Sequence, residues 1–152
     1  MNRLDGVNAI SGREGRAYAK IDGNNEEMFF ARRIEAGVEK TKATVKALGK
    51  RMAGHKTIGG EGKGTMSLYY LSPLFRGLLT RWRSTGQDVF FDLVIENDDI
   101  QSAAGTQQVL LTGVNLDGGV LALLDGTADD PLEEEVSFTF EDFTVMTPFT
   151  KF

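Results

Sequence analysis

The sequence predicts a mainly β chain of the α+β class, an antiparallel β-sandwich or barrel with one flanking α-helix. Two observations predict this class. Apolar and polar residues alternate along most of the chain, as in strands, whereas only one segment repeats its apolar residues at helical spacing. Several alternating segments are apolar on both faces, as expected of a sheet covered on both sides. A chain of 152 residues has the length of one domain, so we expect a single domain over residues 1–152.

The first half of the chain is expected to contain two short strands, a long loop and a third strand. Arg16–Ile21 is a strand, and Asp22–Asn25 supply residues that tolerate the positive φ of a hairpin turn. Met28–Val38 then returns as the second strand. Residues 39–63 have no apolar period and five glycines, which predicts a long, basic, Gly-rich loop. Gly64–Leu71 resumes the strand alternation.

The single helix is expected at about Pro73–Thr85. Ser72 is a good N-cap, Pro73 suits the first helical position, and Gly86 suits the C-terminal stop. The apolar side chains of this segment form one stripe: Leu74, Phe75, Leu78, Leu79 and Trp82. We expect this stripe to be buried, so that the helix plugs the core.

The second half is expected to be all strand again. Its strands are Asp88–Asn97, Gln107–Leu116, Val120–Leu124 and Val136–Met146. In the last strand, three apolar residues on one face oppose three polar residues on the other: Val136, Phe138 and Phe140 against Ser137, Thr139 and Glu141.

Charge is distributed unevenly along the chain, whose formal net charge is −5. Residues 1–83 hold 16 Lys and Arg against 8 Asp and Glu, whereas residues 84–152 hold 1 against 14. Within these halves, residues 39–63 carry seven cations and two carboxylates, and residues 117–135 carry seven carboxylates and no cation. Two interpretations stay open: solvated or mutually neutralising loops within one fold, or a subunit whose basic surface meets the acidic surface of a neighbour.

The composition excludes several classes of site. There is no cysteine, which excludes disulfides, zinc–thiolate sites and thiol nucleophiles, and fits a reducing cytoplasm. The one histidine, His55, leaves no room for a His-rich metal site. The longest apolar run, Val120–Leu124, is far shorter than a membrane span, and Met1–Gly6 lack the apolar segment of a signal peptide.

The motifs that could form a catalytic or ligand-binding site lack the residue pattern that such a site needs. Gly59–Thr65 resembles a phosphate loop, but Lys63 is not followed by Ser or Thr and the segment precedes a strand rather than a helix. Asp98–Asp99 and Asp129–Asp130 lack the spaced oxygen ligands of a calcium loop. Glu141 and Asp142 are adjacent in a strand and so point to opposite faces. We therefore predict no enzyme, and no catalytic, cofactor-binding or metal site.

Segments in order along nearly the whole chain resemble PBSX-type phage tail tube proteins of contractile-tailed phages and related phage-tail-like particles. These segments are Ile10–Arg16, Asp22–Gly23, Glu27–Met28, Glu35–Lys40, Gly49–Thr57, Lys63–Thr65 and Glu133–Phe143. No single motif is diagnostic, but their order and spacing are specific. The chain departs from the family at Asn24–Glu26, in its helix content and over Asp117–Leu132, so contacts made there are not carried over.

The resemblance implies a structural virion protein with the fold that type VI secretion tubes also use. Such subunits form hexameric rings whose inner strands join into one barrel around a channel, and the rings stack into a tube inside a contractile sheath. The channel conducts DNA or, in bacteriocin-like particles, the tube punctures a membrane. Implied partners are further copies of the chain, with sheath, baseplate and tail terminator proteins. DNA is present only transiently, and no cofactor or membrane anchor is implied. Such a tube is assembled in the bacterial host cytoplasm.

Two sets of residues are candidates for these contacts. The basic segment is expected to become ordered on ring stacking, with residues 117–135 as one candidate partner, through Lys40, Lys42, Lys46, Lys50, Arg51, His55 and Lys56. The channel-lining candidates oppose the apolar faces of their strands: Thr65, Ser67, Ser137, Thr139 and Glu141. Two alternatives stay open. The channel-lining residues could cover the outside of a monomer, and the chain could be a small anion- or nucleic-acid-binding module that uses the basic segment.

Overall fold

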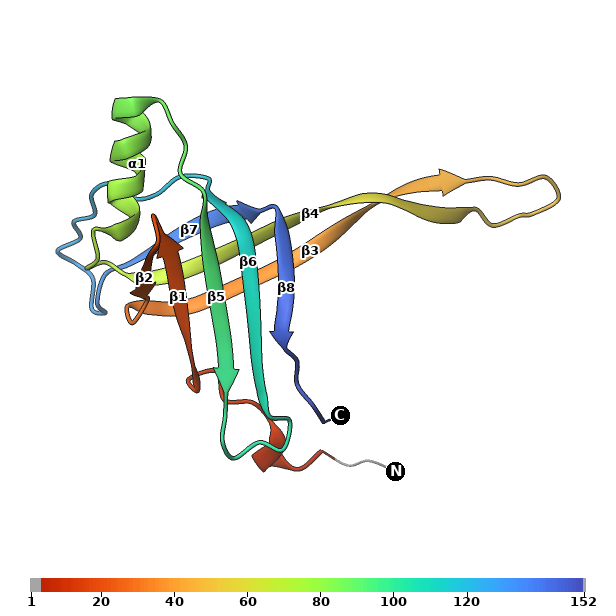
Figure 1. Cartoon of the computed structure of the whole chain (residues 1–152), viewed down its shortest axis with the longest axis horizontal. Helices are drawn as coiled ribbons and strands as arrows, with labels where there is room; N and C mark the ends of the chain where they lie inside the picture. The colour runs from red at the N-terminus through yellow and green to blue at the C-terminus, as the bar shows by residue number, and fades with distance from the viewer. Residues whose placement is uncertain (1–3, 152) are drawn as a thin grey trace.

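In the computed structural model, which describes residues 4–151, two layers of antiparallel strands pack face to face (Figure 1). One α-helix lies at one end of the layers, and a two-stranded ribbon extends far past the other end. This arrangement confirms the predicted class, a mostly antiparallel β fold with one flanking helix.

The chain has eight strands and one α-helix among the described residues. They are β1 (Gly15–Ile21), β2 (Asn24–Glu27), β3 (Ala31–Val45), β4 (Gly54–Tyr69), α1 (Leu74–Thr85), β5 (Phe91–Asp98), β6 (Thr106–Leu116), β7 (Glu133–Phe140) and β8 (Asp142–Thr147). A short 3₁₀ turn, Gly6–Asn8, precedes them.

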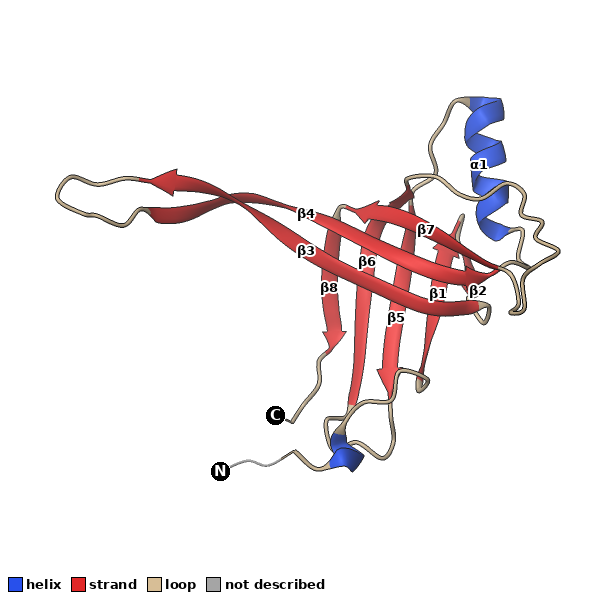
Figure 2. Ribbon diagram, turned by 180° about the vertical axis from the view of Figure 1, so that it is seen from behind, coloured by secondary structure: helices blue, strands red, loops and turns tan. Residues whose placement is uncertain are grey.

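The strands form one hydrogen-bonded path in the order β2-β1-β5-β6-β7-β4-β3, and β8 also pairs with β6. The path folds over at β6. The layer of β3, β4 and β7 therefore crosses over the layer of β1, β2, β5, β6 and β8, as Figure 2 shows.

The turn between the layers is made at Gly113 of β6. Before it, β6 pairs with β8 up to Thr112, and after it Asn115 and Leu116 pair with β7. Gly113 has φ +67°, and a Cβ there would lie 2.8 Å from Cγ of Glu141. A side chain would therefore be strained and blocked at this position. Glu141 is the matching break between β7 and β8, and its N–H donates to the Thr112 carbonyl over 3.0 Å.

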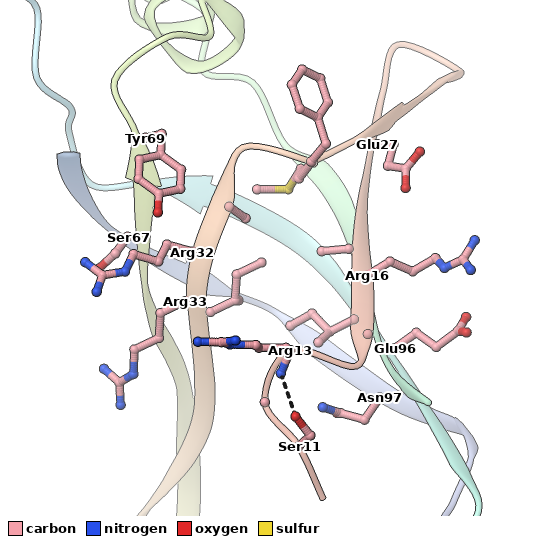
Figure 3. Close-up of a pocket in the computed structure, with 18 of the residues that line it drawn as sticks. Ser11, Arg13, Arg16, Glu27, Arg32, Arg33, Ser67, Tyr69, Glu96 and Asn97 are labelled. Carbon is pink, nitrogen blue, oxygen red and sulfur yellow. Dashed lines mark hydrogen bonds between the residues drawn. The ribbon is translucent and has the colours of Figure 1, made fainter. Parts of the chain in front are cut away.

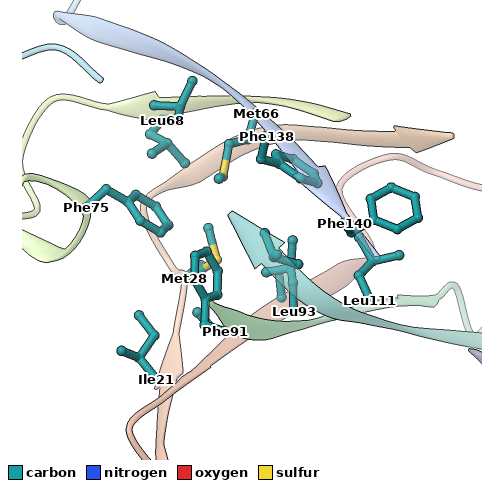
Figure 4. Close-up of a cluster of buried hydrophobic side chains, with 14 of the residues drawn as sticks. Ile21, Met28, Met66, Leu68, Phe75, Phe91, Leu93, Leu111, Phe138 and Phe140 are labelled. Atoms are coloured by element: carbon teal, nitrogen blue, oxygen red, sulfur yellow. The ribbon is translucent and has the colours of Figure 1, made fainter. Parts of the chain in front are cut away.

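The core lies between the two layers, where side chains of both point toward one another (Figure 4). It is built from alternate residues of the strands, as the period of two requires. Its fully buried members are Ala19, Met66, Leu68, Leu93, Val114, Val136 and Phe138.

Two phenylalanines of β7 lie directly on two glycines of β4. A Cβ at Gly64 would lie 2.2 Å from Cζ of Phe138, and one at Gly62 would lie 2.4 Å from Cε2 of Phe140. Glycine is required here because the rings occupy the space that a side chain would need.

The helix begins and ends close to the prediction. Gly86 takes the left-handed conformation at φ 72°, and its N–H donates to the Trp82 carbonyl. Pro73, not Ser72, is the N-cap, and the Ser72 hydroxyl accepts from the Leu74 N–H at 3.3 Å. α1 is the longest helix in residues 4–151, and neither its length nor its apolar content suffices to cross a membrane.

The helix does plug the core, with Leu74 and Leu78 packed against it, but the predicted burial of its whole apolar stripe is wrong. Only Phe75 of its apolar stripe is buried, between Phe30 and Phe91 at ring-centroid distances of 6.4 and 6.0 Å, and Trp82 is half exposed. Strand side chains already fill the space between the layers, so α1 covers one open end of it.

The predicted second strand, Met28–Val38, is also wrong. The partner of β1 is the short β2, and the chain then crosses between layers with Met28 and Phe30 buried in the core. β3 begins at Ala31, in the other layer, and pairs with β4. The buried side chains of the predicted strand therefore lie in this crossing, and its remainder forms the first part of β3.

The long loop predicted over residues 39–63 is a β-ribbon. β3 continues to Val45 and β4 begins at Gly54, so that only residues 46–53 form a connecting loop. Its strands were hidden from sequence analysis because a ribbon that is exposed on both faces needs no apolar alternation.

Two further strand predictions need correction. Val120–Leu124 belongs to a non-strand connection, and Val136–Met146 is two strands, β7 and β8, because the chain changes layer at Glu141.

Substitution Gly64→Ala should lower the free energy of unfolding by about 2–3 kcal/mol, because the new methyl group overlaps the Phe138 ring. The control is Gly59→Ala in the same strand, where a Cβ meets no atom within 4 Å; it should change stability by less than about 1 kcal/mol. Urea denaturation followed by circular dichroism measures both, and equal losses would show that the ring contact is not the cause.

Candidate assembly surfaces

The ribbon of β3 and β4 extends past its own body. β4 pairs with β7 only from Gly62 to Tyr69, so among the described strands Gly54–Glu61 pair with β3 alone. We call residues 39–61 the arm and residues 46–53 its tip. Eight residues at about 3.3 Å each give β4 a reach of about 26 Å beyond the last contact with β7. A two-stranded ribbon without a core is marginally stable in water, so this arm is suited to packing against another surface.

The structure brings all seven predicted inter-ring residues together on the arm. Each of them is exposed: Lys40, Lys42, Lys46, Lys50, Arg51, His55 and Lys56. Sequence analysis missed two apolar residues of the tip, Leu48 and Met52, whose exposed fractions are 105% and 79%. Their signal was present, since each lies isolated among the lysines and arginine of the tip.

Four of the five predicted channel-lining residues form one row on the outer face of the β3, β4 and β7 layer. Thr65 pairs with Ser137 in register, Thr139 pairs with Lys63, and Ser67 pairs with Glu135. Their side chains oppose those of Met66, Leu68, Val136 and Phe138, which enter the core. Glu141 lies apart, at the break after β7, with its side chain over Gly113.

This outer face is weakly acidic. Strand register places two cations and five carboxylates on it: Arg33, Lys63, Glu35, Glu39, Glu61, Glu133 and Glu135. Both cations are paired within the face, Arg33 with Glu35 at 2.6 Å and Lys63 with Glu61 at 3.1 Å. The hydrogen bond from Lys63 to Glu61, followed by their Coulomb attraction, raises the pKa of the lysine.

An open groove lies where the two layers separate between β1 and β3 (Figure 3). In the close-up, Arg16 on β1 and Arg33 on β3 flank the gap, and Arg13 points across it toward β3. Within residues 4–151, the outer edge of β3 has no paired strand. Such an edge exposes backbone N–H and C=O groups that can extend a sheet into another chain.

The connection from β6 to β7, residues 117–132, is held firmly although it contains no strand. We call it the acidic loop. The Arg76 guanidinium donates to Glu134 Oε2 at 2.7 Å, lies 4.6 Å from the centre of the Tyr70 ring, and donates to the Val120 carbonyl at 3.4 Å. The Tyr70 hydroxyl in turn accepts from the Leu123 N–H at 3.2 Å.

Residues 4–151 hold no cluster of three or more histidine and carboxylate side chains that could bind a metal ion. The Gly59–Thr65 segment lies inside β4, away from any helix N-terminus. His55 is exposed on the arm. The surfaces that stand out are therefore ones that suit contact between chains.

A family model described as phage tail tube protein matches residues 2–147. The chain belongs to the phage tail tube protein family. This tail tube chain is 44% identical over 142 residues to the phage-like element PBSX protein XkdM of Bacillus subtilis strain 168, with 93% of each chain covered. Because the family is structural, the chain is a structural tail tube protein and not an enzyme.

Solved structures support the same fold for the tail tube chain. A Bacillus subtilis protein of 42% identity has a TM-score of 0.53 over 93% of this chain and 98% of the other. A chain of the anti-feeding prophage baseplate has 12% identity and a TM-score of 0.68, covering 96% and 97% of the two chains. A chain of an extracellular contractile injection system sheath–tube complex has 11% identity and a TM-score of 0.65, covering 91% and 93%.

Substitution Arg76→Leu should lower the free energy of unfolding by about 3 kcal/mol, because it leaves the buried Glu134 carboxylate without its partner. It should also speed hydrogen exchange at the Leu123 N–H, since the guanidinium packs on the ring of Tyr70. The exposed Arg83→Leu on the same helix is the control and should change stability by less than about 0.5 kcal/mol. Denaturation and exchange that match the control would contradict this account of the loop.

Proposed function

We propose that six copies of this chain close into a ring, and that rings stack head to tail into the inner tube of a contractile tail or phage-tail-like particle. The tube is a channel for DNA passage or membrane puncture. The observation that carries the proposal is the arm, a ribbon of a tail tube protein that extends about 26 Å past the body that should support it.

Ring closure is supported by the open edge of β3. Pairing this edge with a strand of the next copy removes the exposed backbone groups and continues the β3, β4 and β7 layer into a barrel. The same contact repeated around an axis is heterologous and closes on itself. Six copies are proposed because the anti-feeding prophage baseplate is a six-fold symmetrised structure and the gene transfer agent tail was refined with C6 symmetry.

The outer face of the β3, β4 and β7 layer is proposed to line the channel. Hydroxyl groups alternate there with carboxylates, and its two cations are already paired with carboxylates of the same face. Phosphates of DNA would meet a surface of net negative charge, which favours sliding over binding. Thr65, Ser67, Ser137 and Thr139 would face the channel, with Glu141 at the rim of the layer.

Stacking is proposed to use the arm cations, Lys40, Lys42, Lys46, Lys50, Arg51, His55 and Lys56. Further proposed partners are the sheath, baseplate and tail terminator proteins, because the structural neighbours come from a sheath–tube complex, a baseplate and a tube terminator. Assembly is proposed to occur in the bacterial host cytoplasm.

Negative-stain microscopy and sedimentation of the purified chain test the proposal. Rings, or tubes of the same diameter as the rings, support the proposal. A chain that stays single at high concentration and shifts a DNA band would instead support the anion-binding alternative.

Reversing Lys42, Lys46 and Lys50 to Glu should impair tube growth and leave the fold and the ring intact, because the arm makes no core contact. A control that reverses Lys20, Arg83 and Lys151, all exposed, changes the net charge equally outside the arm and outside the groove. Tube length by microscopy and ring mass by sedimentation separate the two effects. Tubes of unchanged length in the arm variant would refute electrostatic stacking.

The channel assignment can be tested with Thr139→Cys, since the native chain has no cysteine. In tubes, the thiol should react with a small maleimide but not with a maleimide on a large polymer, whereas dispersed chains should react with both. Arg83→Cys, on the exposed side of α1, is the control and should react with both reagents in either state. Equal polymer labelling of the two variants in tubes would place Thr139 outside the channel.

A further inference from the structure

The two strongly charged parts of the molecule lie at opposite ends of its longest axis. Figure 1 shows the arm extending from one end, and the acidic loop beside α1 at the other. The arm tip carries Lys46, Lys50 and Arg51 and no carboxylate. The acidic loop carries four aspartates and no cation: Asp117, Asp125, Asp129 and Asp130. Because these charges are far apart within one copy, they cannot neutralise each other there.

Each of these ends also exposes a pair of large apolar side chains. On the arm tip they are Leu48 and Met52, and on the acidic loop they are Leu121 and Leu124, with exposed fractions of 70% and 97%. Charged side chains of a single sign accompany each pair, three cations on the tip and four aspartates on the loop. Apolar residues enclosed by charge are typical of a protein–protein contact.

The leucines of the acidic loop are held outward by the structure. Arg76 binds the Val120 carbonyl and Tyr70 binds the Leu123 N–H, and the side chains of Val120 and Leu123 are half-buried. Leu79 of α1 packs so closely on the loop that a Cβ at Gly119 would lie 2.9 Å from it. The loop is therefore a preformed surface, and binding to it costs little ordering entropy.

Resting on the proposed function, we propose that the arm tip of one copy docks onto the acidic loop of a copy in the next ring. Leu48 and Met52 pack against Leu121 and Leu124. Around this apolar centre, the cations of the tip face the aspartates of the loop. A hydrogen bond from the Thr127 hydroxyl, with a second from its backbone N–H, lowers the pKa of Asp125, so this carboxylate stays charged in mildly acidic conditions.

Other surfaces of the described chain fit the arm tip less well. The groove between β1 and β3 is lined by four arginines against three carboxylates, Glu27, Glu96 and Glu133, so it offers a basic tip no net attraction. The turn after β5 exposes Ile100 beside two aspartates, but Asp98 is half-buried and Asp99 is buried, whereas the last three aspartates of the acidic loop are exposed. Asp98 accepts from the Thr106 hydroxyl at 2.8 Å, and Asp99 accepts from the Ser11 and Gln101 N–H groups at 3.0 and 3.1 Å.

A charge exchange within one chain tests the proposal. The first variant changes Lys46, Lys50 and Arg51 to Glu, the second changes Asp125, Asp129 and Asp130 to Lys, and the third carries all six changes. Each of the first two variants should form rings, but the fraction of rings found in tubes should fall about tenfold, because like charges then meet at the contact. The third variant restores opposite charges at the contact and should recover tubes, because the effects of changes at two contacting sites are coupled. Mixed with the native chain, it should form separate tubes.

A cysteine pair gives a second, independent readout in a chain without native cysteine. Tubes of the Leu48→Cys, Leu124→Cys variant should form covalent ladders on oxidation. The control pair Leu48→Cys with Ile100→Cys should not, although Ile100 is 90% exposed.

The outcomes separate this proposal from the proposed function. A native chain that forms no rings contradicts the proposed function itself. If the native chain forms tubes but the variant with all six changes does not, the acidic loop is not the receptor of the arm tip. Covalent ladders in the Ile100 control alone would lead to the same conclusion. Either result would leave the proposed tube unaffected. Recovery of tubes in the variant with all six changes, together with covalent ladders in the Leu48→Cys, Leu124→Cys variant, establishes the contact.

Discussion

The contact between β7 and β4 is the constraint on which the rest of the structure depends. Phe138 and Phe140 can lie on β4 only because Gly64 and Gly62 leave the space. Both contacts lie within the layer of β3, β4 and β7, and the two rings also belong to the core shared with the other layer. The pairing of β4 with β7 ends at Gly62 and Phe140, so β4 and its partner β3 continue beyond this point as a two-stranded ribbon. Packing that stabilises the body thus determines where the arm begins.

The break at Gly113 and Glu141 complements this contact. Because β6 and the β7–β8 segment change layer at the same height, one hydrogen-bonded path serves both faces of the core. The sandwich is consequently closed along β6 and open along β3. Among the described strands, the outer edges of β3, β2 and β8 are unpaired and available for a neighbour.

Sequence analysis succeeded where a local signal decides the structure. Gly86 ends α1, and Asp22 and Gly23, both at positive φ, make the turn after β1. It failed where tertiary contacts decide. The Val120–Leu124 run is apolar enough for a strand, but Arg76 and Tyr70, distant in sequence, hold its backbone in another shape.

The surfaces show the same division. The clustering of arm cations could be predicted because it is a matter of position along the chain, and so could the row of Thr65, Ser67, Ser137 and Thr139, which follows from strand alternation. The position of Glu141 could not, since it depends on a break set by Gly113. The apolar tip was missed because Leu48 and Met52 form no periodic pattern. Their one signal in the sequence is that each lies isolated among cations, and the structure adds that both are exposed.

The placement of the arm and the acidic loop at opposite ends of the long axis gives any head-to-tail stack of these subunits a direction. One terminus of such a filament would present free basic ribbons, and the other would present preformed acidic surfaces. The two termini would therefore differ in chemistry, would elongate at different rates, and would each require a cap of opposite charge. In a particle built on this subunit, charge alone would distinguish the two ends of the tube.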